Sequence, residues 1–329
     1  MRNLYMLILA IGLCFCIAVQ WTTPKSKIRN ELIRENSIGM SFVEVPPGTF
    51  GMGYSQITEQ LRMLKGFSDQ LFWQAGMHYE TTEVGHSFWL SRFEVTQKQF
   101  AKFVEETGYL TDNERLEIDG NWRETNYPIS EDTPVTQVSL NDATAFCKWL
   151  SEKEGKLYRL PTETEWEYAC RAGSSALFSF GDDAALMPKH GNIADQSLEK
   201  TPAITQPTRK YSKGDDGFCY LAPVGSFLPN KFGLYDMHGN SAEICSDFFR
   251  TRDSGGLGKP YPELCVVRGG GWCCPEAFST TFYRLEVSRN LGSLITGFRV
   301  IQEERLSDDH TKDKVNQSPI ESLPSKNKP

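Results

Sequence analysis

Residues 174–231 contain no long periodic segment, and this stretch most constrains the fold of the chain. Glycine, aspartate, asparagine and proline are frequent there, which is typical of turns. So long an irregular segment inside a compact domain is uncommon unless something orders it. Metal ions order loops rich in Asp and Asn, because hard cations bind carboxylate, amide and backbone oxygens. The sequence therefore predicts long loops that need an additional source of order, such as a bound metal ion.

Two places offer ligands for calcium. One combines Asn192 with residues 214–218, and the other is residues 236–243, which begin with Asp236 and end with Glu243. Calcium suits such loops because it tolerates irregular coordination. Turns in which Asp and Asn side chains bond their own backbone explain the same residues without any metal. Both interpretations are consistent with the sequence.

Regular elements precede this stretch. Residues 42–53 are expected to form a strand, a Pro-Gly turn and a second strand, and residues 88–95 a strand that enters a helix. Thr96 and Gln99 have capping-box spacing, so the helix should begin there. Gly108 is expected to end it.

Two more helices are expected. Asn141 should cap the first, and its apolar spacing turns Cys147 toward the core. The second should begin at Thr162, with Cys170 on its buried face, and close at Gly173. Few short helices, scattered strands and long loops together indicate the α+β class.

Residues 266–301 hold the best candidate site. Three consecutive glycines, residues 269–271, indicate a bend or a close approach to a ligand. Trp272, Cys273 and Cys274 follow at once. Residues 297–301 are expected to form a buried closing strand. A glycine-rich hairpin with small buried cysteines explains the same stretch without chemistry.

The two ends of the chain indicate export and a single folded domain. Residues 1–24 combine Arg2 with an apolar run at 4–19, which is typical of a targeting segment. A cleaved signal, a lipoprotein signal and a retained membrane anchor all fit it. Residues 25–37 are expected to be a linker, residues 38–302 the domain, and residues 303–329 a disordered tail.

Charge and cysteine content exclude some classes of function. A net charge of −7 without a basic stripe argues against a nucleic-acid partner. The nine cysteines show no CxxC pair and no zinc spacing, so a structural zinc site is not expected. Membrane contact is expected only through the N-terminal segment.

Several blocks together resemble one family, the formylglycine-generating enzymes or sulfatase-modifying factors. The blocks run in the family's order and are residues 44–53, 94–100, 134–147, 159–169, 232–243 and 268–272. The resemblance covers residues 38–302. It implies one domain related to the C-type-lectin-like fold, with little regular secondary structure and with calcium. A sulfatase, or another exported protein or peptide, is the implied partner.

The resemblance also implies calcium ligands in the two loops selected above. One ion would take side chains of Asn192 and Asp216 and carbonyls of Ile193 and Phe218. The second ion would take side chains of Asp236 and Glu243 and carbonyls of Gly239 and Ser241.

Active members of the family use oxygen and copper(I) to oxidise a sulfatase cysteine to formylglycine. Two cysteines hold the copper, because soft thiolates suit Cu(I). Counted from Trp272, the first copper position is Cys274 and the second is Ser279. Gly271 stands where the family has a serine. The candidate catalytic set is therefore Gly271, Trp272, Cys274 and Ser279.

Other cysteines of the family are also replaced. Arg284 and Val300 stand at two such positions, so Cys147 and Cys170 lack their expected disulfide partners. A second thiolate for copper would have to come from elsewhere, for example Cys245 or Cys265. In extended backbone Cys273 would point away from Cys274.

These residues support two functions. The first is an exported oxidase that converts a sulfatase cysteine to formylglycine, with its competence in doubt because Ser279 replaces a thiol. The second is a non-catalytic, calcium-braced binding module or envelope-associated scaffold of the same fold.

Overall fold

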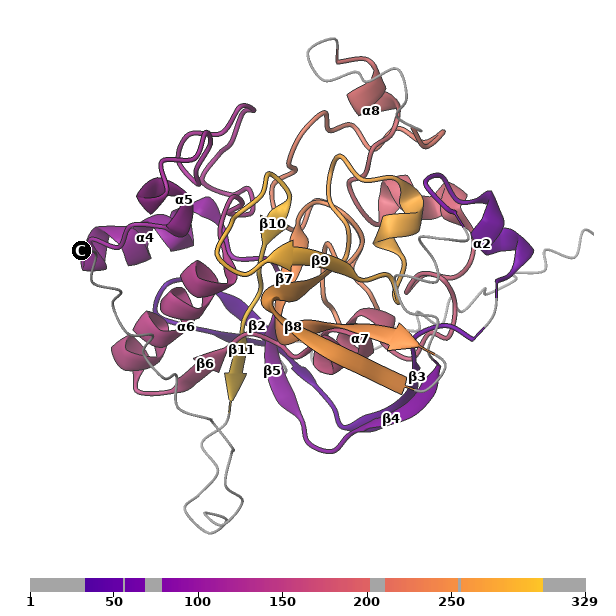
Figure 1. Cartoon of the computed structure of the whole chain (residues 1–329), viewed down its shortest axis with the longest axis horizontal. Coiled ribbons are helices and arrows are strands. Elements are labelled where there is room, and N and C mark those ends of the chain that lie inside the picture. The colour runs from indigo at the N-terminus through magenta and orange to yellow at the C-terminus, as the bar shows by residue number, and fades with distance from the viewer. Residues whose placement is uncertain (1–32, 56, 69–78, 202–210, 254–255, 304–329) are drawn as a thin grey trace, which may run out of the picture. The chain divides into compact units, whose positions relative to one another are not determined.

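The computed structural model describes residues 33–55, 57–68, 79–201, 211–253 and 256–303 (Figure 1). The targeting segment 1–24 and nearly all of the expected tail lie outside these residues. Strand β1 (Ile33–Glu35) extends the ordered structure into the segment expected to be a linker. None of the helices in the described part of the chain is long and apolar enough to cross a membrane.

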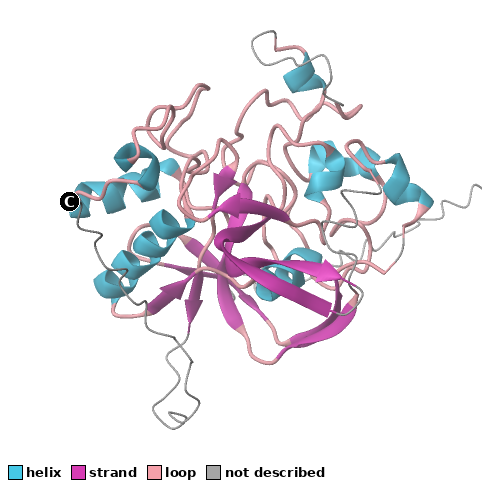
Figure 2. Cartoon of the chain, in the orientation of Figure 1, coloured by secondary structure: helices cyan, strands magenta, loops and turns pink. Residues whose placement is uncertain are grey.

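The fold is α+β, as predicted, with strands in three sheets and helices outside them (Figure 2). The first sheet has the order β1, β2 (Ser41–Val45), β5 (Phe88–Ser91), β11 (Ile301–Glu303) and β6 (Leu157–Arg159). The second has the order β10 (Thr296–Gly297), β7 (Ala242–Asp253), β8 (Gly256–Arg268) and β9 (Leu285–Ser288). Strands β3 (Gly48–Met52) and β4 (Glu80–Val84) form the third.

Two predicted capping boxes are confirmed. Sequence alone could predict them because a capping box depends only on residues close together in the chain. Thr96 and Gln99 cap α4 (Gln97–Thr107), which ends at Gly108. Thr162 and Glu165 cap α7 (Glu163–Arg171). The remaining helical segments are short, and they are α2 (Glu59–Met63), α5 (Asp112–Arg115), η1 (Ala184–Lys189), α8 (Gln196–Glu199) and η2 (Glu276–Ser279).

Three boundary predictions were wrong. Ser139, and not Asn141, caps α6 (Leu140–Glu154), because Ser139 also completes a capping box with Asp142. Ala172 is the left-handed C-cap of α7, and Gly173 follows it. The expected closing strand at 297–301 is divided between β10 and β11. Between these strands, the carbonyls of Phe298 and Val300 accept hydrogen bonds from the N–H groups of Val95 and Ser91.

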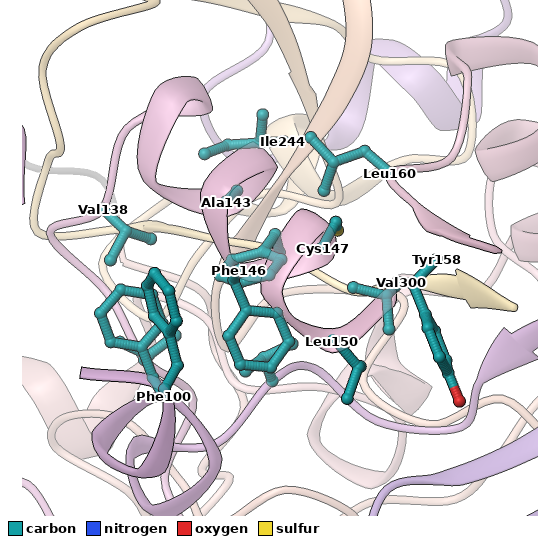
Figure 3. Close-up of a cluster of buried hydrophobic side chains, with 14 of the residues drawn as sticks. Phe100, Val138, Ala143, Phe146, Cys147, Leu150, Tyr158, Leu160, Ile244 and Val300 are labelled. Atoms are coloured by element: carbon teal, nitrogen blue, oxygen red, sulfur yellow. The ribbon is translucent and has the colours of Figure 1, made fainter. Parts of the chain in front are cut away.

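The main core lies around α6 (Figure 3). Phe146 and Cys147 of α6 are buried there, as the apolar spacing predicted, together with Phe100 of α4 and Ile244 of β7. A second cluster surrounds Trp166 of α7 and includes residues of β2, β5, β7 and β8. Two smaller apolar clusters include residues of the loops that follow α7, one with Phe178 and Ile193 and the other with Leu198.

A network of buried ion pairs joins α7 to the strands. Arg268, at the end of β8, contacts Glu163 and Glu167 at 2.7 Å each. Arg284 binds Glu163, and Arg171 binds Glu167 at 2.8 Å. Burial makes these pairs costly to break, because removing one partner leaves a charge without compensation.

We expect Glu163→Gln to lower the free energy of unfolding by about 3–5 kcal/mol, because it removes the buried carboxylate that Arg268 and Arg284 share. Glu152→Gln is the matched control. Its partner Lys148 is 4.0 Å away and both side chains are exposed, so we expect a loss below about 0.5 kcal/mol. Urea unfolding of both variants measures the difference, and equal losses would contradict the importance of the network.

Candidate functional site

The glycine run after β8 makes the sharp bend that its sequence predicted. Gly269 and Gly270 have φ values of +90° and +71°, which disfavour any other residue. A Cβ on Gly270 would lie 2.4 Å from Oγ of Ser279. A Cβ on Gly271 would lie 2.9 Å from the Cβ of Ile295. The bend therefore places the glycines directly against η2 and the residues before β10.

Trp272 and Cys274 lie in the turn that follows the glycines. The N–H of Cys274 donates to the carbonyl of Gly271 at 2.8 Å, so the backbone is a turn and not extended. Trp272 is buried against Tyr127 and Tyr220, with ring centroids 5.3 and 5.6 Å apart. Its role in the described structure is to fix this turn by packing.

Ser279 closes the candidate site from the other side. It is fully buried, and its Oγ has no hydrogen-bond partner among the described residues. Its carbonyl accepts a hydrogen bond of 2.8 Å from Nδ1 of His238. The hydroxyl at the position that the family resemblance assigns to a copper thiol is therefore a neutral, hard group that is buried from water.

The two neighbouring thiols face different tyrosines. Burial raises the pKa of Tyr283, and the nearby Cys274 raises it further. Burial also raises the pKa of Tyr127 to about 12, with a contribution from Cys273. The expectation that the two sulfurs point apart assumed extended backbone, and the structure has a turn there.

The cysteines considered as a second copper ligand lie elsewhere. Cys245 of β7 is buried in the cluster around Trp166, and burial raises the pKa of its thiol well above the usual value. Cys265 of β8 is buried in the main core, where burial raises its thiol pKa to about 11. Burial therefore disfavours the thiolate form of both cysteines in the absence of a metal. One thiol and one hydroxyl do not fit a two-thiolate Cu(I) site.

His238 is a site residue that sequence reasoning missed. It is buried, and burial lowers its pKa to about 4. Because Nδ1 donates to Ser279, Nε2 accepts from the Ser179 N–H at 3.1 Å and its hydroxyl at 2.8 Å. A neutral imidazole thus positions the backbone of Ser279. Only its place in the block 236–243 could have indicated this.

The four residues predicted for the first calcium ion lie together. Asp216 accepts from the N–H of Phe218 at 2.8 Å and the N–H of Ile193 at 3.0 Å. The bond to Phe218 is the side-chain turn that was the alternative to a metal. Oδ1 of Asn192 is buried without a partner in the described structure, and burial raises the pKa of Asp216 to about 7. A buried amide oxygen and a desolvated carboxylate are both ligand types that calcium takes.

The second predicted calcium site is only partly available. Oδ1 of Asp236 and Oγ of Ser241 are buried without partners among the described residues. Asp236 is held at φ +58°, and burial raises its pKa to about 6. Both oxygens of Glu243, however, bind Arg299, and one also accepts from the Trp166 indole. The negative charge of Glu243 is therefore already balanced by the guanidinium of Arg299.

Glu94 is a further carboxylate at the second site, and sequence reasoning missed it. Its Oε2 has no partner in the described structure, and burial and the nearby Asp236 raise its pKa. The buried carboxylates of Glu94, Asp236 and Glu243 thus all lie near the guanidinium of Arg299. Gly239, at φ +95°, lets the backbone pass against the carbonyl of Asn192.

Asn240 joins the two loops. Its N–H donates to the carbonyl of Asn192 at 2.7 Å, and its side chain donates to Glu94 at 3.1 Å. Within the described residues, no group of three or more His, Cys, Asp or Glu side chains is placed to hold a metal ion. Calcium would therefore depend on backbone, amide and hydroxyl oxygens around Asp216 and Asp236.

The α+β fold, the irregular loops and the glycine turn define a domain of the sulfatase-modifying type. The chain matches the model of the sulfatase-modifying factor enzyme 1-like domain over residues 31–304. It therefore belongs to this family.

Named relatives include active and inactive enzymes. The chain is 33% identical to bovine formylglycine-generating enzyme over 58% of each chain. It is 32% identical to a bovine protein named inactive C-alpha-formylglycine-generating enzyme 2, over 49% of this chain and 45% of that one. The structure of PvdO from Pseudomonas aeruginosa is similar with a TM-score of 0.64 and 27% identity, covering 83% of this chain and 98% of that one.

We expect Gly270→Ala to be more destabilising than Gly173→Ala. Both glycines have positive φ, but a Cβ on Gly173 meets nothing within 4 Å. Gly173→Ala should cost about 1–2 kcal/mol through backbone strain. Gly270→Ala should cost about 1–3 kcal/mol more, because its methyl group collides with Ser279. Thermal or urea unfolding compares them, and equal losses would show that the close packing is unimportant.

Proposed function

We propose that this chain is an exported, calcium-braced binding member of the sulfatase-modifying factor family, and that it recognises a sulfatase or another exported polypeptide without copper-dependent oxidation. One observation carries the proposal. The residue at the second copper position is Ser279, whose hydroxyl is buried and unmatched in the described structure. Neutral hydroxyls bind Cu(I) poorly, so the donor set supports binding better than oxidation.

Calcium supports this function by fixing the loops that lack ladder hydrogen bonds. Asn192 and Asp216 would hold one ion, with carbonyls of Ile193 and Phe218. Asp236, with carbonyls of Gly239 and Ser241, would hold the second, and Glu94 lies beside it. A bound divalent cation neutralises buried carboxylates and satisfies carbonyl oxygens. Asn240 would couple the two loops, so that ordering one loop also orders the other.

The second candidate is oxidation of a sulfatase cysteine to formylglycine. Cys274 and Trp272 keep their family positions, and the bovine relative that is 33% identical is named for this activity. The chain spans 58% of that relative's length. The export that both candidates share is supported by the composition of residues 1–24.

A copper assay separates the two candidates. We expect the wild-type protein to form no aldehyde on a sulfatase-derived peptide in the presence of copper and oxygen. We expect Ser279→Cys to increase Cu(I) affinity at least about tenfold, because it supplies a second thiolate beside the glycine turn. Adding Cys274→Ser to this variant should remove the gain. Aldehyde formation by the wild type would reject the non-catalytic proposal.

Calcium removal tests the bracing of the loops. We expect a chelator to lower the melting temperature by about 5–10 °C relative to calcium at a hundredfold excess over its dissociation constant. Asp216→Asn should abolish the part of the response that comes from the first ion. Asp215→Asn is the control, because the neighbouring Asp215 is half-exposed and pairs with Lys200 at 2.7 Å. An unchanged melting temperature in the wild type would rule out calcium at these loops.

A further inference from the structure

Two neighbouring loops carry a large share of the exposed apolar side chains. The first loop is residues 110–118, which include α5, and the second is residues 291–294, between β9 and β10. Five of the twelve large apolar side chains that are exposed in the described structure lie on these two loops, and they are Leu110, Leu116, Ile118, Leu291 and Leu294. Single exposed leucines are ordinary, but a cluster of them marks an interaction site.

The side-chain amide of Asn113 joins the two loops. Its Nδ2 donates to the carbonyl of Gly292 at 3.2 Å and to the carbonyl of Gly120 at 3.1 Å. Its oxygen accepts from the N–H of Gly292 at 2.9 Å. Asn113 is fully buried, so these bonds are shielded from water. The exposed apolar residues of both loops flank these contacts and therefore lie on adjoining segments.

The backbone of the second loop is held tightly. A Cβ on Gly292 would lie 2.2 Å from the carbonyl carbon of Gln137, and the N–H of Gln137 donates to the carbonyl of Ser293 at 3.0 Å. The carbonyl of Leu294 accepts from the indole N–H of Trp272 at 3.4 Å, which places this loop beside the glycine turn. A fixed backbone lowers the entropy cost of binding a partner.

Exposed carboxylates lie among the apolar residues of the first loop. Glu117 and Asp119 alternate along the chain with Leu116 and Ile118. Both acidic side chains are exposed, and neither makes an ion pair with another described residue. Their negative charges are therefore available to a partner.

The nearby arginines do not balance these two charges. Arg115 pairs with Asp112 at 3.0 Å, and Arg123 lies 3.9 Å from Glu114. The surface formed by the two loops is thus both apolar and negatively charged. A segment with apolar and basic side chains complements it, and such complementarity selects partners and speeds their association.

The same charge disfavours two other occupants. Anionic lipid headgroups would bring like charges against the carboxylates of the first loop. A second copy of the chain that docked through the same loops would do the same. Single-stranded or double-stranded nucleic acid is disfavoured for the same reason.

We propose that residues 110–118 and 291–294 form a docking surface for a polypeptide segment that combines apolar and basic side chains. This inference rests on the part of the proposed function that both candidates share, recognition of a polypeptide. It adds the chemistry of the recognised segment and the surface that holds it. The two loops contain none of the candidate catalytic residues and none of the predicted calcium ligands, so they can be altered without changing either set.

Fluorescence anisotropy on the full chain tests the surface with three labelled peptides of equal length, which repeat Leu-Lys-Gly, Leu-Glu-Gly or Ser-Lys-Gly. We expect the Leu-Lys-Gly peptide to saturate the protein below about 1 mM. The other two should bind at least about tenfold more weakly, because one lacks the basic groups and the other the apolar groups. Added salt should weaken binding of the Leu-Lys-Gly peptide by screening its charges.

One substitution in each loop locates the surface, Leu116→Ser and Leu294→Ser. Each should weaken binding of the Leu-Lys-Gly peptide about tenfold, because it removes apolar area that the peptide would cover. Leu157→Ser is the matched control, because Leu157 of β6 has the same 55% exposure as Leu116 and lies outside both loops. It should leave binding unchanged.

Three results would overturn the proposal. The first is no saturation by the Leu-Lys-Gly peptide, and vesicle flotation with phosphatidylcholine and sedimentation of the wild type and Leu116→Ser then show whether a neutral membrane or a second copy occupies the surface. The second is equal binding of the Leu-Lys-Gly and Ser-Lys-Gly peptides. The third is an equal loss of binding in Leu157→Ser and Leu116→Ser.

The proposed function can fail separately from this surface. Its own tests are aldehyde formation and the response to calcium removal, and neither depends on the two loops. Aldehyde formation together with weaker peptide binding by Leu116→Ser would reject the non-catalytic proposal and keep the docking surface. Peptide binding that both serine variants leave intact would reject the surface and keep recognition of a polypeptide.

Discussion

The buried contact between Arg268 and the two glutamates of α7 is the constraint on which the rest of the structure depends. Arg268 is the last residue of β8, so it fixes where the strand ends and the glycine turn begins. It also holds α7 against the sheet that carries the candidate site. Buried ion pairs add little net stability, but they allow few alternative arrangements, because each unpaired charge would be costly. The main contribution of these ion pairs is therefore to fix the position of α7 relative to β8.

The same network supplies an ionic link at a position where the family resemblance implies a cysteine. Arg284 stands where the family resemblance places a cysteine, and it binds Glu163 through its guanidinium. Cys170, on the same helix as Glu163, is a buried thiol whose pKa is raised by burial. An ionic link thus ties the segment before β9 to α7. In this chain the cross-link is electrostatic and does not require an oxidising environment.

Sequence reasoning succeeded where neighbouring residues decide the structure. The capping boxes at Thr96 and Thr162 and the buried face of α6 follow from local spacing, and the structure confirms them. It was incomplete where distant residues decide. Glu243 stays a predicted calcium ligand, and its block gave no sign that Arg299, far along the chain, binds both its oxygens. Glu94 and His238 were missed for the same reason, because their partners are remote in sequence.

The contacts that fix the shape of the candidate site do not depend on the hydroxyl of Ser279. The core around α6, the cluster around Trp166 and the arginine network contain no contribution from the Ser279 hydroxyl. A hydroxyl at the position where the family resemblance implies a copper thiol is therefore compatible with the packing of the fold. The turn at Trp272 is held by aromatic contacts and the backbone of Ser279 by His238, so the shape of the surface persists. A fold whose stability lies outside its reactive groups can lose oxidation chemistry and keep a surface that recognises a partner.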